Sequence, residues 1–404
     1  MSTPQDILFS PLALRNVTLP NRLVRSATYE GWGDPNGAPR PPLASLYGDL
    51  ARGGVGTIIT GFAFISQAGR AMQPGQCGID ADDKIAPWRE IVSRVRDADA
   101  GTKLFMQIAH AGRQTSRRVT GRPVVGASRR RCTYFRQRVG ALDDEGIGAI
   151  VDEYATAARR AEEAGFDGVQ VHGAHGYLVH QFLSRWTNAR RDRWGEPPLF
   201  LEEVIRAIRT RCGGMFPVLV KLSASDDRSP GLRIEDTIYA AKRLEELEVD
   251  AVEISYGTME FAMNIFRGAC PVNVVLEVNP LFNRIPRWLR GLWKRFGAKR
   301  YLKRFMPFRE NYNAPAASQI KKATGLPVIV VGGIRSVGGM VACLTAHDLD
   351  AVSLCRPLIC EPDWPAKIRD GVSDRSRCTN CNLCTVHCDS RQPLRCYQKR
   401  REDQ

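Results

Sequence analysis

Short runs of β-branched and apolar residues alternate with longer amphipathic segments along almost the whole chain. Eight of these runs have the length of a buried strand: 23–26, 57–60, 103–108, 168–172, 218–222, 251–255, 328–331 and 351–354. Helical periodicity occurs between several of them, over 82–100, 145–164, 199–212, 234–247, 316–323 and 337–346. Buried strands joined by helical crossovers form parallel sheets. The alternation therefore predicts an α/β protein, either a (β/α)8 TIM barrel or a doubly wound sheet.

The distribution of polar and titratable residues favours the barrel, because they follow the ends of many different predicted strands. A doubly wound nucleotide-binding domain concentrates them after its first strand, and no G-x-G-x-x-G stands there. We therefore predict one barrel over residues 1–370. The stretch 257–313 is too long for an ordinary barrel loop, so we expect an insertion between the sixth strand and the sixth helix. Residues 371–404 are predicted to form a short Cys-rich tail.

Much of the net charge of +15 lies inside the predicted insertion. Between positions 284 and 309 of the insertion there are ten basic residues and no acidic one: Arg284, Arg287, Arg290, Lys294, Arg295, Lys299, Arg300, Lys303, Arg304 and Arg309. Apolar residues recur among them at helical spacing, namely Ile285, Trp288, Leu289, Leu292, Trp293 and Phe296. A basic amphipathic helix of this kind suits peripheral docking to a membrane or a protein, or packing on the protein's own core. No nucleic-acid-binding module is recognisable, so no nucleic-acid partner is expected.

Five of the twelve cysteines crowd into the tail. Cys378, Cys381, Cys384 and Cys396 follow a C-x2-C-x2-C-x11-C pattern, and Cys388 is an alternative ligand. Two-residue gaps let thiolates converge on one metal centre, so the tail suits a [4Fe–4S] cluster, a zinc ion or no metal. The other seven cysteines are scattered singly and are expected to be small buried residues.

The N-terminal residues lack the basic start, apolar run and cleavage site of a secretory signal. No window approaches the roughly 18 consecutive apolar residues of a membrane span. We therefore expect a cytoplasmic protein whose membrane contact, where it has any, is peripheral.

Two histidines and a tyrosine follow the fourth predicted strand, as His172, His175 and Tyr177. In a barrel this position is the C-terminal mouth, where barrel enzymes carry out their chemistry. Imidazole N–H groups can hold a carbonyl oxygen that gains negative charge, and a phenol can deliver a proton. These three side chains are therefore the predicted catalytic residues.

Several segments, in order along the chain, resemble the Old Yellow Enzyme family of FMN-dependent NADH:flavin oxidoreductases. They are LFSP at 8–11, NRLVRSATY at 21–29, QIAHAGR at 107–113, HGAHGY at 172–177, VGGIR at 331–335 and CRPLICEP at 355–362. The resemblance extends from about residue 7 to residue 396. The cysteine tail resembles the branch that contains 2,4-dienoyl-CoA reductase and trimethylamine dehydrogenase.

The resemblance implies a flavoprotein with FMN on the C-terminal face of the barrel. The backbone amides of Gly332 and Gly333 would hold the phosphate, with Cys355 and Arg356 beside them. The residues expected around the ring system are Ser26, Ala27, Thr28, Tyr29, Gly61, Gln107 and Lys221. Lys221 stands where the family commonly has Arg, and it keeps the positive charge that stabilises a reduced flavin. A lysine in so apolar a strand also needs an anionic partner.

The implied reaction is reduction of the activated C=C bond of an α,β-unsaturated carbonyl compound, an enone or an enoyl-CoA-like molecule. FMN would carry hydride from NADH or NADPH to the β-carbon, while His172 and His175 polarise the carbonyl and Tyr177 protonates the α-carbon.

Two alternatives to this reaction stay open. One is a flavin-linked amine or alcohol dehydrogenase, and the other is a membrane-docked electron-transfer subunit. Relatives with the cysteine tail relay electrons to further flavin and nucleotide domains, which the sequence does not continue into after Gln404. We therefore expect any such relay to involve a separate protein, and a homo-oligomer is expected by analogy.

Overall fold

Eight parallel strands close into a barrel in the computed structural model, which describes residues 3–279, 282–390 and 392–398. The barrel strands are β3 (Leu23–Arg25), β4 (Thr57–Ile59), β6 (Lys103–Ala109), β9 (Gly168–Gly173), β10 (Val218–Ser223), β11 (Ala251–Ser255), β12 (Val328–Val331) and β13 (Ala351–Leu354). Each strand pairs with the next in this order, β13 pairs with β3, and the pairing of β4 with β6 completes the ring. The predicted (β/α)8 barrel is confirmed, and the doubly wound alternative is wrong.

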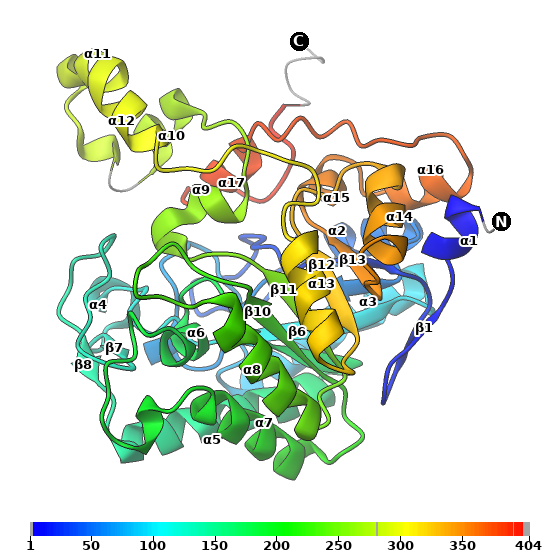
Figure 1. Ribbon diagram of the computed structural model, residues 1–404, viewed down its shortest axis with the longest axis horizontal. Helices are drawn as coiled ribbons and strands as arrows, with labels where there is room; N and C mark the ends of the chain where they lie inside the picture. The colour runs from blue at the N-terminus through cyan, green and yellow to red at the C-terminus, as the bar shows by residue number, and fades with distance from the viewer. Residues whose placement is uncertain (1–2, 280–281, 391, 399–404) are drawn as a thin grey trace.

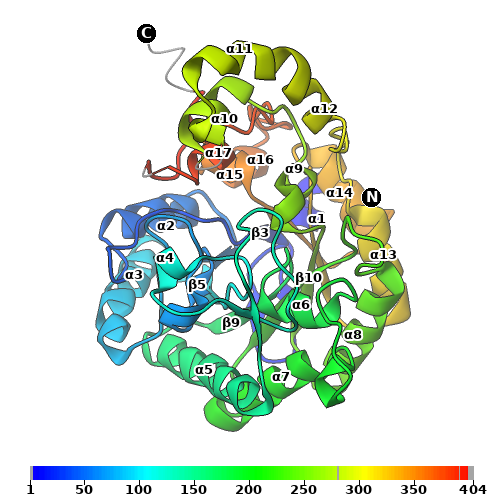
Figure 2. The same ribbon diagram turned by 90° about the vertical axis from the view of Figure 1, so that its left-hand side faces the viewer.

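Helices surround the strands, as Figure 2 shows most clearly. They are α2 (Pro42–Arg52), α3 (Ile85–Ala98), α5 (Asp144–Glu163), α7 (Leu199–Cys212), α8 (Ile234–Glu246), α13 (Ala314–Ala323), α14 (Val337–Thr345) and α16 (Trp364–Arg369). The longest one, α5, begins where Asp143 accepts a hydrogen bond from the N–H of Gly146, and it buries Ile147, Ile150 and Tyr154 at helical spacing. Apolar stripes of this kind hold the helices against the barrel.

A short antiparallel hairpin closes the amino-terminal end of the barrel. It consists of β1 (Leu12–Ala13) and β2 (Thr18–Leu19), and its leucines pack among Val24, Leu219 and Ile329 inside the ring of strands. The other short elements are α1 (Pro4–Leu8), β5 (Ala63–Phe64), α4 (Arg117–Thr120), β7 (Val125–Gly126), β8 (Gly140–Ala141), α6 (Leu178–Leu183) and α15 (Arg356–Cys360). With the amino-terminal end filled, the barrel is accessible from its carboxyl-terminal end.

The segment between β11 and α13 projects away from the barrel, at the upper left of Figure 1. It contains α9 (Ala262–Ile265), α10 (Val272–Val278), α11 (Arg290–Leu292), a π-helical stretch over Trp293–Ala298 and α12 (Lys299–Leu302). The expected single amphipathic helix is thus a helical run over 290–302 that changes from α to π and back. Single-turn 3₁₀ helices at Phe282–Arg284 and Arg287–Leu289 precede it. The ring of Trp293 occupies the space that a Cβ at position 297 would need, so Gly297 permits this packing.

The C-terminal tail crosses the barrel mouth, where Figure 1 draws it in red beside the insertion. It contains α17 (Leu383–His387), and the N–H of Leu394 donates a hydrogen bond to the carbonyl oxygen of Glu30, just after β3. Insertion and tail therefore both cover the end of the barrel that the hairpin leaves open. Within the described ranges, no helix is long and apolar enough to cross a membrane.

Candidate active site

A cavity of about 300 Å³ lies at the carboxyl-terminal ends of the barrel strands. The predicted site residues that line it are Ser26, Ala27, Thr28, Tyr29, Gln107, His172, His175, Tyr177, Lys221, Gly332, Gly333, Cys355 and Arg356. These residues lie in or follow six different strands, so closure of the barrel brings them together. Gly61 is different, because its N–H donates to Glu30 Oε1 at 2.8 Å and a Cβ there would collide with Glu30 and Thr28. Gly61 is not among the residues that line the cavity, whereas the next residue, Phe62, is. A place for Gly61 beside the cofactor stays a prediction.

The predicted catalytic residues gather around a tight turn after β9. His175 has a left-handed backbone conformation with φ of 61°, and Gly176 follows with φ of 79°. Left-handed conformations are uncommon for residues other than glycine and are concentrated at functional sites. The turn brings the ring of His172 to 5.2 Å from that of His175 and 4.9 Å from that of Tyr177, measured between centroids. Phe62 packs 5.2 Å from the Tyr177 ring and helps to fix its position.

Hydrogen bonds orient both imidazoles. His175 Nε2 lies 2.8 Å from Ser255 Oγ, which is the last residue of β11. The N–H of Ala174 donates to His172 Nδ1 at 3.3 Å, which leaves the proton of a neutral His172 on Nε2. The backbone N–H of His175 donates to Ser223 Oγ at 3.1 Å, at the end of β10. Neither serine was predicted, although Ser255 ends a predicted strand next to the site and Ser223 directly follows another.

Burial sets the protonation states of these groups. It lowers the pKa of His172 well below its ordinary value, with further lowering from His175 and Lys221. Burial, followed by the charge of Lys221, lowers the pKa of His175 in the same way. Burial raises the pKa of the Tyr177 phenol above its ordinary value. At neutral pH the site therefore presents two neutral imidazoles and a protonated phenol, all of which can donate a hydrogen bond.

A buried polar network forms one wall of the cavity beside the catalytic turn. Lys221 Nζ donates to Ser26 Oγ at 2.9 Å, and Ser26 Oγ donates to Glu253 Oε1 at 2.7 Å. Gln107 donates to Gln170, which in turn donates to Glu253 Oε2, both at 2.7 Å. Glu253 is thus the anionic partner that the sequence predicted for Lys221. The sequence feature that could have identified Glu253 is that it is the one charged residue inside the apolar run 251–255.

The turn after β12 has the properties of an anion site. Gly332 and Gly333 have φ values of 148° and 76°, and a Cβ at either position would lie within 2.7 Å of Asn313 Nδ2 or the carbonyl oxygen of Arg309. Within the described part of the chain, neither glycine N–H donates a backbone hydrogen bond. Successive bare N–H groups of this kind form a concave site for phosphate.

Arg356, expected as the charged partner of a phosphate, also joins three parts of the chain. From Nη1 it donates to the carbonyl oxygens of Phe266 and Arg267 at 3.1 and 2.9 Å, and to Asn382 Oδ1 at 2.5 Å. The first two residues belong to the insertion and Asn382 belongs to the tail. This guanidinium therefore fixes both covering segments over the cavity that it lines.

The outer wall of the cavity consists largely of apolar and aromatic side chains that no motif predicted. They come from the loop between β7 and β8, from the insertion and from the tail, and include Tyr134, Phe135, Met259, Met263, Phe266, Phe282, Tyr301 and Leu394. Tyr134 Oη accepts a hydrogen bond from Asn279 Nδ2 at 3.0 Å, which joins that loop to the insertion. The entrance to the site is therefore apolar.

The tail cysteines lie near the cavity without forming a preassembled metal site. Among the residues that the structure describes, no group of three or more His, Cys, Asp or Glu side chains is arranged to hold a metal ion. Cys396 Sγ lies 3.8 Å from Cys360 Sγ, and Cys388 lines the cavity. Cys360 had been expected to be an ordinary buried residue. The chemistry of the thiols suits a cluster, but their described positions do not converge on one centre.

Comparison with known proteins gives the family. The model of the NADH:flavin oxidoreductase / NADH oxidase family matches residues 7–284. The chain belongs to this family. Its members are flavin-dependent, and the Old Yellow Enzyme resemblance is confirmed.

The similar relatives include proteins of about the same length as this chain and proteins about twice as long. The NADPH dehydrogenase of Geobacillus sp. strain WCH70 is 30% identical over 366 residues, which cover 89% of this chain and 93% of that protein. The NADH oxidase of Thermoanaerobacter brockii is 30% identical over 382 residues, which cover 93% of this chain but 53% of that protein. The chain thus spans about half the length of the longer relative. The solved Old Yellow Enzyme homologue from Zymomonas mobilis has a TM-score of 0.70 and 25% identity, over 91% of this chain and 94% of its own.

The residues of this family member fit FMN. The glycine turn after β12 offers N–H groups that donate no backbone hydrogen bond among the described residues, and the ion-paired Lys221 lines the same cavity. The cavity between them is bounded by Ala27, Gln107 and the catalytic turn.

Proposed function

We propose that the protein is an FMN-dependent ene-reductase that uses NADH or NADPH to reduce the activated C=C bond of an α,β-unsaturated carbonyl compound. The observation that carries the proposal is the pair of buried, neutral imidazoles beside a protonated phenol in one cavity. Such a set is suited to a neutral substrate whose oxygen gains negative charge during the reaction. When bound, FMN supplies hydride, which it receives from the nicotinamide.

Each residue of the turn has a separate role in this proposal. The N–H on Nε2 of His172 donates to the substrate carbonyl oxygen. His175 donates to it from Nδ1 while its Nε2 accepts a hydrogen bond from the Ser255 hydroxyl. Tyr177 donates its phenolic proton to the α-carbon, and burial keeps that proton in place until it is needed. Lys221 would provide positive charge to the bound cofactor, and Gln107 would contribute hydrogen bonds to it, since both side chains line the cavity.

The apolar outer wall supports an uncharged or lipophilic substrate more than a small ionic one. The carbonyl group is the part that the polar inner wall can recognise. The alternative is a flavin-linked amine or alcohol dehydrogenase. In that enzyme the substrate would reduce the flavin, whereas in the proposed reaction the reduced flavin reduces the substrate.

For the tail we propose a [4Fe–4S] cluster at Cys378, Cys381, Cys384 and Cys396, with Cys388 as the alternative ligand. Support comes from the spacing of the thiols, which is typical of iron–sulfur sites. The described positions of the cysteines would have to move to bind it. No step of the proposed reaction depends on this metal.

The proposed reaction is tested by two anaerobic half-reactions on the flavin-loaded protein. NADH or NADPH should bleach the flavin absorbance, and an enone or enoyl-CoA should restore it while amines and alcohols should not bleach it. Bleaching by amines without reoxidation by any activated alkene would overturn the proposal in favour of the dehydrogenase. If neither NADH nor NADPH bleached the flavin, the proposal that a nicotinamide is the hydride donor would be overturned.

A further inference from the structure

Three large apolar side chains lie exposed on one face of the insertion. Trp288 is 80% exposed, Leu292 is 59% exposed and Phe296 is 63% exposed. Their spacing of four residues places them along one side of the helical run over 287–302. We refer to residues 282–309 as the basic arm. A helix that only packed on its own protein would turn such a stripe inward, whereas these three side chains face solvent.

The inner face of the basic arm already has partners. Trp293 packs against Phe282 with 5.3 Å between ring centroids, and Phe282 packs against Tyr301 at 5.4 Å. Tyr301 packs against Phe305 at 5.1 Å. This row of aromatic rings holds the arm together from inside. The exposed stripe is therefore a second apolar face, not the inner face left uncovered.

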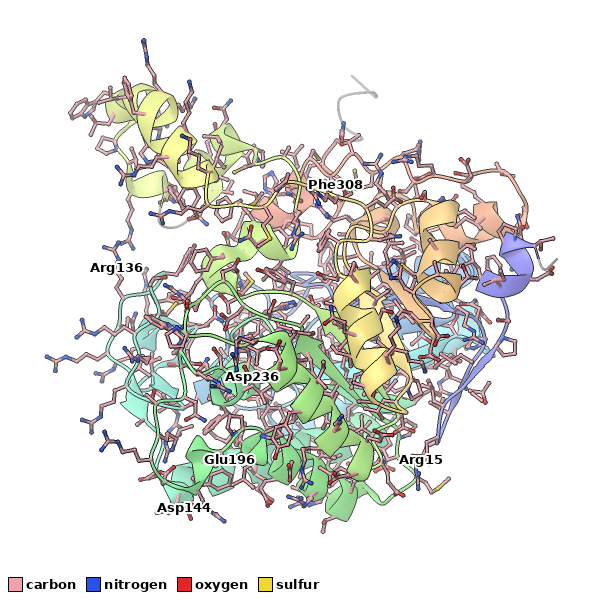
Figure 3. The ribbon with its side chains drawn as sticks, in the orientation of Figure 1. Arg15, Arg136, Asp144, Glu196, Asp236 and Phe308 are labelled. Carbon is pink, nitrogen blue, oxygen red and sulfur yellow. The ribbon has the colours of Figure 1, made fainter. Side chains whose placement is uncertain are left out.

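The charges around the exposed stripe are of one sign. All ten basic residues of the arm except the half-buried Arg290 are exposed, and within the described residues none of the ten takes part in a salt bridge. Figure 3 shows side chains extending outward from the projecting arm, with the labelled Arg136 below it on the loop after β7. Tyr134, two residues earlier in that loop, contacts Asn279 next to the arm. The arm thus combines an exposed apolar stripe with unpaired positive charge.

We propose that the basic arm docks the protein onto an anionic lipid bilayer, with Trp288, Leu292 and Phe296 entering the interface between headgroups and acyl chains. Anionic headgroups complement the unpaired arginines and lysines, and the interfacial region accepts Trp, Leu and Phe side chains. A nucleic acid would satisfy the charges but would leave the helical apolar stripe in water. The bilayer accounts for both properties of the arm.

Docking also orients the cavity. Phe282 and Tyr301 belong to the inner face of the arm and line the cavity at the same time. A bilayer bound to the outer face of the arm therefore lies within a few helix diameters of the substrate entrance. The projection of the arm from the barrel in Figures 1 and 2 leaves that outer face accessible.

The test is co-sedimentation of the flavin-loaded protein with sucrose-filled vesicles. Vesicles of phosphatidylcholine with about 30% phosphatidylglycerol should pellet the protein at about 0.1 M salt, and pure phosphatidylcholine should not. Raising the salt to about 1 M, where the screening length falls to about 3 Å, should weaken binding. No binding to the anionic vesicles would overturn the proposal.

Matched variants separate docking from simple charge attraction. The double variant Trp288→Ser, Phe296→Ser should bind the anionic vesicles about tenfold or more weakly, because it removes two large apolar contacts. Met215→Ser, which removes a 75% exposed apolar side chain from the loop between α7 and β10, should bind like the wild type. Flavin content should be equal in all three proteins, which shows that the arm variant is folded. Both proteins should bind a soluble polyanion equally tightly, because the double variant keeps every basic residue of the arm. Unchanged vesicle binding by the double variant would overturn lipid insertion.

Discussion

Lys221 and Glu253 stand opposite each other in register on β10 and β11, with Lys221 Nζ 3.2 Å from Glu253 Oε2. Both side chains are buried, at 3% and 0% exposure. Burial opposes ionisation of Glu253, but Lys221 and hydrogen bonds from Ser26 and Gln170 outweigh it and hold the pKa of this carboxyl below its ordinary value. The wall of the cavity therefore carries a buried ion pair with no net charge.

The ion pair predicts how Glu253 tunes the cofactor. In Glu253→Gln the hydrogen bonds to Ser26 and Gln170 can persist, but the charge of Lys221 is no longer balanced. A net positive charge next to a reduced flavin stabilises it, so the midpoint potential of the bound FMN should rise, by about 30 mV for each tenfold gain in stability of the reduced form. A redox titration of the purified holoenzyme measures the shift.

The conservative variant Glu253→Asp is the control, since it keeps the charge and should leave the potential nearer the wild-type value. An unchanged or lower potential in Glu253→Gln would show that Glu253 does not act on the flavin through Lys221. Removing one member of a buried ion pair also costs about 3–5 kcal/mol of stability, so flavin content must be measured alongside the potential.

Tyr177→Phe should separate the two halves of the proposed reaction. The ring would keep its contacts with Phe62 and His172, so the cavity should retain its shape. The phenolic proton would be lost, and proton donation of this kind contributes about 10²–10⁴-fold to a rate. Stopped-flow absorbance should show flavin reduction by NAD(P)H near the wild-type rate and reoxidation by an enone slowed by that factor. Equal slowing of both phases would argue against Tyr177 as the proton donor.

The barrel could be predicted from the sequence because each strand is a local apolar run and each helix has its own periodicity. The predicted strand 251–255 and helix 199–212 coincide with β11 and α7. The partner of Lys221 could not be predicted, because the register between β10 and β11 is a property of the closed barrel and of no local pattern. The lone Glu253 in an apolar strand was the available signal. A buried carboxylate needs a cation, and Lys221 also stands inside a predicted apolar strand.

Position in a motif was a less reliable guide than the packing of side chains. Gly61, expected at the cofactor because of where it stands in the chain, is not among the residues that line the cavity, and Glu30 and Thr28 fill the space around it. The aromatic residues Phe282 and Tyr301 line the cavity, although they belong to a segment without any motif. The sequence also left open whether the apolar stripe of the arm faces the protein or the solvent. Periodicity shows that a helix has an apolar face, whereas only the structure shows which residues of it, such as Trp288, are exposed.

Stability should fall in mild acid because His110 is buried without charge. Burial lowers its pKa to about 4, below the ordinary value near 6.5. Between those two pH values the unfolded chain binds a proton that the folded protein does not, so the free energy of unfolding decreases as the pH falls through this window. The loss from this one residue should reach about 3 kcal/mol near pH 4. Urea unfolding at several pH values from 7 to 4.5 measures the slope.

His110→Asn is the matched variant for this pH dependence. Its side-chain oxygen can accept the hydrogen bond that the N–H of Gly112 now donates to His110 Nδ1. The variant should be less stable than the wild type at pH 7 but should lose less stability on acidification. A slope identical to that of the wild type would show that other groups cause the acid sensitivity.

The proposed cluster is tested by replacing one cysteine in the tail and one outside it. Cys384→Ala removes a thiol of the C-x2-C-x2-C pattern, whereas Cys212→Ala changes a half-buried cysteine on α7. Protein prepared without oxygen should contain about four iron atoms per chain in the wild type and in Cys212→Ala. Cys384→Ala should contain much less and lose the broad absorbance near 400 nm that accompanies the cluster. Zinc or no metal in the wild type would exclude the cluster.

The arm and the cavity together predict a substrate preference, which depends on both the proposed reaction and the proposed docking. Because Phe282 and Tyr301 connect the two, a lipophilic enone held in anionic vesicles should reach the cavity from the bound bilayer. Wild-type turnover of such a substrate should exceed that of Trp288→Ser, Phe296→Ser by about the ratio of their vesicle binding. Turnover of a water-soluble enone should be equal in the two proteins, because neither substituted residue lines the cavity. Equal turnover of the vesicle-held enone, with docking intact, would show that the bilayer anchors the protein without supplying its substrate.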